Sequence, residues 1–358
     1  MNIRPYADKE ISLLGIGLCQ LRTLAGCYER KAAVQALEYA LESGITYVDL
    51  GFPEMIRDKD LIRGYGNLLK DADICTTLKA NVHRLTDGKE LEQRFHDALE
   101  TYEIERPSFL QLYGISRTSW NRIRNNGVLQ KAMELKANGQ AEALTMHYTD
   151  DRFYLKPVLQ ENIFEGLSIE LSAIELPRNS GSLKTAGDFG LHTIVTGSLK
   201  NGRILQELDL KSAICADLFA PTVSSVLLEL LSEREVKDAV CAAEEADEKK
   251  DYVRAQLAAK KARDVFYKKR MIQCEVCRCC MPCPQGFNVP RIAELYNETL
   301  MFGEPELSAV QYRIENLGER SCINCGKCHK KCPREFDIGS IATKSAKFFE
   351  EVLKESVL

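Results

Sequence analysis

The sequence lacks the features of a membrane or secreted protein. No stretch approaches the roughly eighteen consecutive apolar residues of a membrane-spanning helix, and the opening MNIRPYADKE has no apolar signal-peptide core. No low-complexity tract, Gly/Ser linker or basic stripe is present, and the net charge is -4. We therefore expect a cytoplasmic protein with reduced thiols, with neither membrane nor nucleic acid as a partner, and without recruitment of partners through bulk electrostatics.

Cysteine, by contrast, is abundant and concentrated near the C-terminus. Nine of the fourteen cysteines fall in two runs, CEVCRCCMPCP from residue 274 and CINCGKCHKKCP from residue 322. The second run reads C-x2-C-x2-C-x3-C-P, a spacing typical of bacterial two-cluster ferredoxins, in which three thiolates hold one cubane and the fourth holds the other. The pattern predicts two [4Fe-4S] clusters and hence electron transfer.

Spacing assigns four cysteine ligands to each cluster. Cys279 is left over, because only its neighbour Cys280 keeps a two-residue step on both sides. The first run departs from the standard form, with two residues rather than three before its Cys-Pro. Zinc ribbons also use paired C-x2-C units, and disulfides are a further alternative that a reducing compartment disfavours. The predicted ligands are, for cluster 1, Cys274, Cys277, Cys280 and Cys332, and for cluster 2, Cys322, Cys325, Cys328 and Cys283.

Basic residues stand between and beside these cysteines. Cations and backbone amides near a cluster raise its reduction potential, because four thiolates leave the cubane negatively charged. An ordinary solvated surface is the alternative explanation. The basic residues are Arg278, Lys327, Lys330, Lys331 and Arg334.

Ahead of the cysteine runs, short β-branched segments alternate with amphipathic stretches, the pattern of βα units around a parallel sheet. Eight such units predict an α/β fold, a (β/α)8 TIM barrel with its chemistry at the C-terminal ends of the strands. We expect this barrel over residues 1–240, a helical connector over 241–270, and a small ferredoxin-like iron–sulfur domain over 271–358. The eight candidate strands begin at Leu13, Thr46, Ile74, Phe109, Glu142, Leu167, His192 and Ser224.

The stretches between the strands predict helices. Residues 29–44 end in a Gly C-cap signal, and residues 87–104 begin with an Asp N-cap candidate. Residues 119–140 predict a helix long enough to cover two strands. We also expect one or two helices over 233–269, and two more, over 289–303 and 305–318, between the cysteine runs.

With these strands placed, the chain resembles the aldo-keto reductases, and specifically the branch with a C-terminal ferredoxin-like extension. The segment ALESGITYVDLG is similar to the helix and strand that end in that family's catalytic Asp. The segments CEVCRCCMPCPQGFNVPR and SCINCGKCHKKCP look like the extension of that branch. Weaker similarities are LQLYG and VSSVLLELLSEREVKDAV, which correspond to the fourth strand and to the last strand and helix.

The resemblance implies a tetrad of Asp, Tyr, Lys and His, in which Tyr protonates the substrate carbonyl and a nicotinamide supplies hydride. Asp49 matches the Asp, and Lys79 matches the Lys. Glu54 stands where the Tyr is expected, and Tyr113 stands at the His position. The loss of the proton donor argues against ordinary carbonyl reduction.

The positions that correspond to nicotinamide contacts are altered too. His147 and Tyr148 replace a Ser and a small polar residue, and Glu170 replaces a Gln. Glu229 and Leu231 replace a Gly-x-Ser that approaches the cofactor phosphate, where a carboxylate would repel it. These changes argue against NAD(P)H as a cofactor.

The polar residues at the C-terminal end of the predicted barrel, here called the barrel mouth, are compatible with several functions. Asp49, Lys79, Glu54, Tyr113 and His147 are the candidate catalytic residues; His83 and Glu170 lie nearby in the prediction, and Cys19 ends the first strand. One hypothesis is an iron–sulfur oxidoreductase whose barrel binds a small molecule. Another is an electron-transfer module whose inactive barrel docks the cluster lobe onto a redox partner protein. The third is an NAD(P)H-dependent reductase with an altered site.

Overall fold

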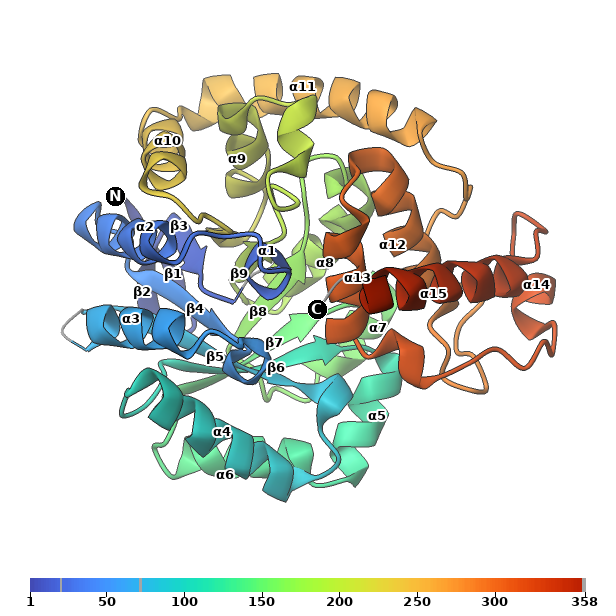
Figure 1. The fold of residues 1–358 in the computed structure, drawn as a ribbon, viewed down its shortest axis with the longest axis horizontal. Helices are drawn as coiled ribbons and strands as arrows, with labels where there is room; N and C mark the ends of the chain where they lie inside the picture. The colour runs from blue at the N-terminus through green and yellow to red at the C-terminus, as the bar shows by residue number, and fades with distance from the viewer. Residues whose placement is uncertain (20, 71–72, 356–358) are drawn as a thin grey trace. The chain divides into compact units, whose positions relative to one another are not determined.

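The computed structural model describes residues 1–19, 21–70 and 73–355 (Figure 1). The chain divides into two compact units. One comprises Met1–Thr23 and Cys27–Ala262, and the other comprises Leu24–Gly26 and Arg263–Leu358. The boundary falls inside helix α11 (Glu248–Lys268), within the stretch predicted to be a helical connector.

The first unit is a closed barrel of eight parallel strands in the order β10-β3-β4-β5-β6-β7-β8-β9, surrounded by helices (Figure 1). This confirms the predicted (β/α)8 TIM barrel, and every candidate strand overlaps an observed one. The strands read as continuous apolar runs because both faces are covered; in β6 all seven residues are buried. The strands are β3 (Leu14–Gly17), β4 (Tyr47–Gly51), β5 (Cys75–Asn81), β6 (Phe109–Ile115), β7 (Ala143–Tyr148), β8 (Gly166–Glu170), β9 (Thr193–Thr196) and β10 (Val223–Leu228).

The barrel helices largely follow their sequence signals. The Asp87 carboxylate caps α4 by accepting from the Glu90 amide at 3.0 Å, as the sequence predicts. The single long helix predicted over 119–140 is wrong, because the chain breaks at Gly127, whose φ of +81° is left-handed. The helices are α1 (Leu21–Leu24), α2 (Arg30–Glu42), α3 (Lys59–Leu69), α4 (Gly88–Tyr102), α5 (Arg117–Asn125), α6 (Val128–Ala137), α7 (Arg152–Leu159), α8 (Leu176–Asp188), α9 (Leu210–Leu218) and α10 (Glu233–Glu244), with 3-10 turns η1 (Pro53–Met55), η2 (Val82–Arg84) and η3 (Arg203–Gln206).

An antiparallel hairpin that the sequence did not predict closes the N-terminal end of the barrel. Strands β1 (Ile3–Tyr6) and β2 (Lys9–Ser12) pair with each other. Tyr6 is fully buried and meets the ring of Phe109, the first residue of β6, edge-on at 5.1 Å between ring centroids. Because this end is filled by side chains, the opposite end is left for a functional site.

The second unit packs helices around its own apolar core. The predicted helices over 289–303 and 305–318 are present as α12 and α13. Arg291 of α12 donates to Glu315 at 2.6 Å and to Glu294 at 2.8 Å, and all three side chains are buried. The first cysteine run lies between α11 and α12, and the second leads into α14. The elements are α12 (Val289–Phe302), α13 (Pro305–Ile314), η4 (Leu317–Glu319), α14 (Lys327–Lys331) and α15 (Ile338–Glu355).

Among the residues that the structure describes, none of the helices combines the length and the apolar character that crossing a bilayer requires.

Candidate functional site

A buried ion pair lies at the C-terminal end of the barrel. The Lys79 Nζ of β5 lies 2.7 Å from the Asp49 Oδ2 of β4, and the two side chains are only 11% and 2% exposed. The other Asp49 oxygen accepts from the Gly51 amide at 2.8 Å. Gly51 has a φ of +66°, and a Cβ there would lie 2.2 Å from the Cys19 Cβ, so only glycine fits. The predicted partners Asp49 and Lys79 are therefore in direct contact.

Aromatic rings surround the lysine of this pair. The Tyr113 ring stacks on His147 with 4.3 Å between centroids and 8° between planes, and meets Phe52 edge-on at 4.9 Å. The Lys79 Nζ lies 5.5 Å from the Tyr113 centroid and 5.7 Å from that of Phe52. These rings are buried, so they hold the ammonium by cation–π attraction and keep water from it. Tyr113 and His147 thus join the pair as predicted neighbours.

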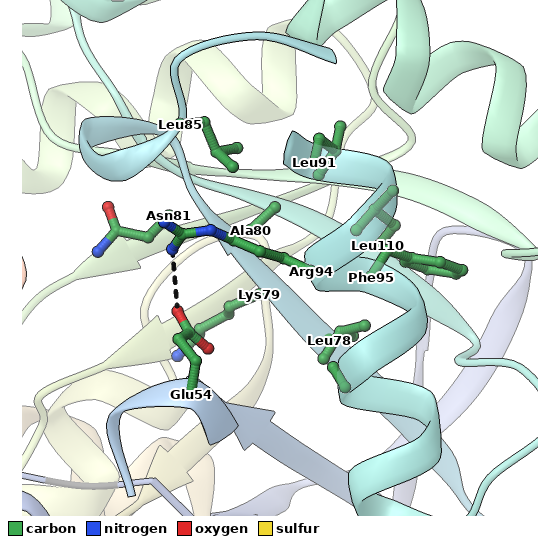
Figure 2. Close-up of a pocket in the computed structure, with 11 residues that line it drawn as sticks. Glu54, Leu78, Lys79, Ala80, Asn81, Leu85, Leu91, Arg94, Phe95 and Leu110 are labelled. Carbon is green, nitrogen blue, oxygen red and sulfur yellow. Dashed lines mark ion pairs between the residues drawn. The ribbon is translucent and has the colours of Figure 1, made fainter. Parts of the chain in front are cut away.

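Glu54 does not join the pair. It lies in η1, and its carboxylate Oε1 lies 3.8 Å from the Arg94 guanidinium of α4. Figure 2 shows Glu54 pointing toward Arg94, at the edge of a small pocket whose other walls are mainly apolar side chains of β5, β6 and α4. Burial raises the pKa of Glu54. The residue at the expected tyrosine position therefore directs its acid group toward a helix.

Glu229 follows β10 and lies among charges from both sides of the mouth. Its Oε2 is buried and has no hydrogen-bond partner among the described residues. Burial raises the pKa of Glu229 to about 7, while the positive charges of Lys79 and Arg203 lower it and the carboxylate of Glu170 raises it. A carboxyl with this pKa exchanges protons near neutral pH, which makes it chemically capable of acid–base work.

Glu170 belongs to a second group of ion pairs at the C-terminal end of the barrel, here called the Lys200 group. The Lys200 Nζ lies 2.9 Å from the Glu170 Oε1 and 3.2 Å from the Glu175 Oε2. The Lys200 side chain is buried, and its backbone is left-handed with a φ of 47°. Ser172 donates to the same Glu175 oxygen at 3.0 Å. The Lys200 group links the C-terminal ends of β8 and β9.

Four residues at this end of the barrel were not predicted from the sequence: Lys200, Glu175, Arg203 and Phe52. A usable signal was the stretch LKNGR, which places a lysine and an arginine around a turn directly after the seventh barrel strand. Phe52 gave no signal, because its role depends on a ring contributed by another strand.

The other predicted mouth residues serve local structure. The Tyr148 hydroxyl donates to the Asp151 carbonyl at 2.6 Å, beside the start of α7. His83 lies in η2 against Gly114, where a Cβ would lie 2.3 Å from its Nε2. The Cys19 thiol donates to the Phe52 carbonyl at 3.3 Å, and burial raises its pKa to about 12. The thiol of Cys19 is therefore protonated at neutral pH.

The nine clustered cysteines all belong to the second unit, and none of the fourteen forms a disulfide. The Val276 amide donates to the Cys274 Sγ at 3.4 Å, and the Asn324 amide donates to the Cys322 Sγ at 3.3 Å. A Cβ built on Gly339 would lie 3.0 Å from the Cys328 Sγ and 3.8 Å from the Cys322 Sγ. Backbone amides aimed at sulfur, and a glycine that leaves room beside it, are features that a thiolate site uses.

The two cysteine runs approach each other in space: Arg334, which follows the second run, pairs with Glu275 of the first at 3.3 Å, and cysteines of both runs pack against the same apolar core. Burial raises the pKa of the Cys274 thiol, and repulsion from the charges of Glu294, Cys277 and Cys332 adds to the effect. Burial also raises the pKa of Cys280 to about 12, and Cys274, Cys277 and Cys328 add to it. These interactions join cysteines 274–280 with cysteines of the second run, across about fifty residues of chain.

Comparison with solved structures identifies the architecture of the barrel. An aldo-keto reductase from Bacillus halodurans in its holo form is similar with a TM-score of 0.60 and 17% identity, over 73% of this chain and 96% of that one. An aldo-keto reductase from Klebsiella pneumoniae in complex with NADPH has a TM-score of 0.58 and 13% identity, over 72% and 95%. A putative aldo-keto reductase from Pseudomonas aeruginosa has a TM-score of 0.55 and 15% identity, over 67% and 96%.

The barrel has the aldo-keto reductase fold. At these identities the likeness shows the fold alone. No protein-family model matches the chain, and no curated protein matches it.

The cysteine side chains do not converge on one point. Within residues 1–19, 21–70 and 73–355, no three His, Cys, Asp or Glu side chains are arranged to hold a single metal ion. A single zinc ion requires sulfurs at about 2.3 Å from one centre. A cubane instead spreads its thiolates over four iron atoms, so ligation of a cluster does not depend on such convergence.

Proposed function

We propose that this protein is an iron–sulfur electron-transfer protein with an aldo-keto-reductase-type barrel and two [4Fe-4S] clusters. The observation that carries the proposal is the approach of the two cysteine runs, seen in the 3.3 Å ion pair between Arg334 and Glu275 and in the apolar core against which cysteines of both runs pack. The ferredoxin spacing requires a ligand exchanged between clusters, and the electrostatic influence of Cys332 on Cys274 supports Cys332 in that role.

The proposed ligand sets follow from the same spacing. Cys279 is exposed, whereas Cys280 is partly buried and interacts with Cys274, which supports Cys280 as the ligand. The donor set fits the group, because thiolates bind iron and backbone amides already point at two of the sulfurs. The sets are Cys274, Cys277, Cys280 and Cys332 for cluster 1, and Cys322, Cys325, Cys328 and Cys283 for cluster 2.

Clusters bound at these residues supply one-electron transfer. The chain contributes thiolate ligands, hydrogen bonds from the Val276 and Asn324 amides that stabilise negative charge on sulfur, and an apolar core beneath the loops. Electrons are exchanged with a redox partner protein or with a small molecule in the barrel.

The barrel mouth favours a reaction or ligand other than ordinary carbonyl reduction. Glu54 stands at the expected tyrosine position and is directed at Arg94, so the residue at that position does not act as a proton donor beside the Asp49–Lys79 pair. The pair and the buried aromatic rings around Lys79 form a shielded corner, in which the charges of Lys79 and Asp49 balance, and such a corner suits a small polar ligand.

The proposal is tested by metal analysis of anaerobically prepared protein. We expect about eight iron and about eight sulfide per chain, with broad absorption near 400 nm. Cys280→Ser should lower the iron content by about half, whereas the matched variant Cys279→Ser should retain it. Stoichiometric zinc, or colourless protein without iron after reconstitution, would contradict the proposal.

A further inference from the structure

The second cysteine run lies in a segment without acidic residues. Residues 320–334 contain five Lys or Arg residues and no Asp or Glu, although the whole chain has a net charge of -4. All five cations are exposed. Screening limits each charge to about 8 Å at physiological salt, so a partner at this segment meets the local charge rather than the net charge of the chain.

Three of these cations lack an ion-pair partner in the part of the chain that the structure describes. Lys327, Lys330 and Lys331 of α14 form no ion pair with any other residue that the structure describes. The two arginines of the segment, in contrast, lie beside glutamates. The three ammonium groups are therefore free to meet carboxylates of another molecule.

An apolar side chain lies next to these lysines. Ile323 is 59% exposed, and the loop that carries it leads directly into α14. Two residues further on, Cys325 is the exposed member among the proposed ligands of the second cluster. An apolar centre with a charged rim is the usual composition of a protein–protein interface.

We propose that Ile323, Lys327, Lys330 and Lys331 form a docking surface, here called the α14 face, for an acidic one-electron carrier protein. This inference rests on the proposed function, because Cys325 would hold the cluster that serves as the redox centre at this surface. That cluster, when reduced, would supply one electron to the oxidised carrier, and no covalent bond would form or break. Carboxylates on the carrier pair with the lysines, and an apolar spot covers Ile323.

The exposed isoleucine distinguishes this surface from a site for a polyanion. Nucleic acids are bound mainly through charge, and an uncharged apolar side chain at the centre adds little to such binding. The overall charge of -4 also opposes a long polyanion, whereas a small acidic protein contacts only the local patch.

The full-length protein is first loaded with iron–sulfur clusters under anaerobic conditions. The test then measures its binding to oxidised flavodoxin, an acidic one-electron carrier, and uses cytochrome c, a basic carrier, as the control. We expect flavodoxin to bind at about 20 mM ionic strength and to bind at least about tenfold more weakly at about 200 mM. The triple variant K327E/K330E/K331E should weaken binding at least about tenfold, and Ile323→Asn about threefold. The matched reversal of exposed α11 lysines, K249E/K260E/K261E, should change it less than about twofold.

Several outcomes would overturn the docking surface. These are no binding of flavodoxin by the loaded protein, equal weakening by both triple variants, or tighter binding of duplex DNA or anionic vesicles than of flavodoxin. A shift in reduction potential in K327E/K330E/K331E with unchanged binding would assign the lysines to the cluster alone. Iron content and absorption near 400 nm, measured for every variant, separate a failure of docking from a failure to bind iron.

Discussion

Lys79 and Asp49, from neighbouring strands of the barrel, form an ion pair of 2.7 Å that is almost completely shielded from water. Removing one partner leaves the other charge buried, which costs far more than the loss of an exposed pair. We expect Lys79→Met to lower the free energy of unfolding by about 3 to 5 kcal/mol, and K79M/D49N to recover most of it. Urea denaturation measures both.

An exposed ion pair provides the control for this prediction. Lys70 pairs with Glu103 at the surface, so Lys70→Met should cost less than about 1 kcal/mol. If K70M and K79M lose the same amount of unfolding free energy, the Asp49–Lys79 pair contributes no more to stability than a surface contact.

The buried carboxyl of Glu229 predicts a pH dependence of stability. Its pKa is raised to about 7 in the folded chain from 4.5, because burial disfavours the charged form. The contribution of protonated Glu229 to the free energy of unfolding is therefore complete below pH 4.5 and is lost as the pH rises through about 7. Glu229→Gln mimics the protonated form, so its stability relative to the natural chain should rise by about 2 kcal/mol between pH 5 and pH 8.

Urea unfolding at several pH values checks this result. The exposed residue Glu233 lies four positions away, at the start of α10, and Glu233→Gln should show no such trend. A flat difference between E229Q and the natural chain would place the Glu229 carboxyl in a water-like environment.

Much of the barrel follows from sequence patterns, since buried strands are short apolar runs with β-branched residues and helices carry caps such as Asp87. The hairpin of β1 and β2 was missed, because each strand has only four residues and depends on the burial of Tyr6 under the barrel. The break at Gly127 was missed because a single glycine is also tolerated inside helices.

The candidate site was predictable only in part. Asp49 and Lys79 lie two residues before the C-terminal ends of neighbouring strands, so their contact could be inferred from the barrel topology. The direction of Glu54 could not be inferred, because it depends on Arg94 of α4. The Lys200 group of ion pairs depends on a left-handed loop conformation that sequence periodicity does not encode. The cysteine ligands of the two iron–sulfur clusters remain a prediction from the spacing of the cysteines.

Nicotinamide binding should be absent. The positions that resemble the family's cofactor contacts carry Glu170 and Glu229, and the second is largely ionised at pH 8. A carboxylate repels a cofactor phosphate. Titration at pH 8 with NADPH and NADH up to about 1 mM, the upper end of ordinary KM values, should give no saturable fluorescence change and no bleaching near 400 nm. Saturable binding with bleaching would restore the reductase hypothesis.

Gly339 offers a sharp test of the second cluster, because its Cα faces two of the proposed ligands. In the first turn of α15, alanine is ordinarily more favourable than glycine by up to about 1 kcal/mol, so Gly339→Ala should not unfold the chain. The added Cβ would lie 3.0 Å from the Cys328 Sγ and displace that thiol. We expect iron to fall from about eight to about four per chain in G339A, while Ser340→Ala keeps about eight. Full iron content in G339A would show that the Cys328 sulfur is not held at this position when the cluster is bound.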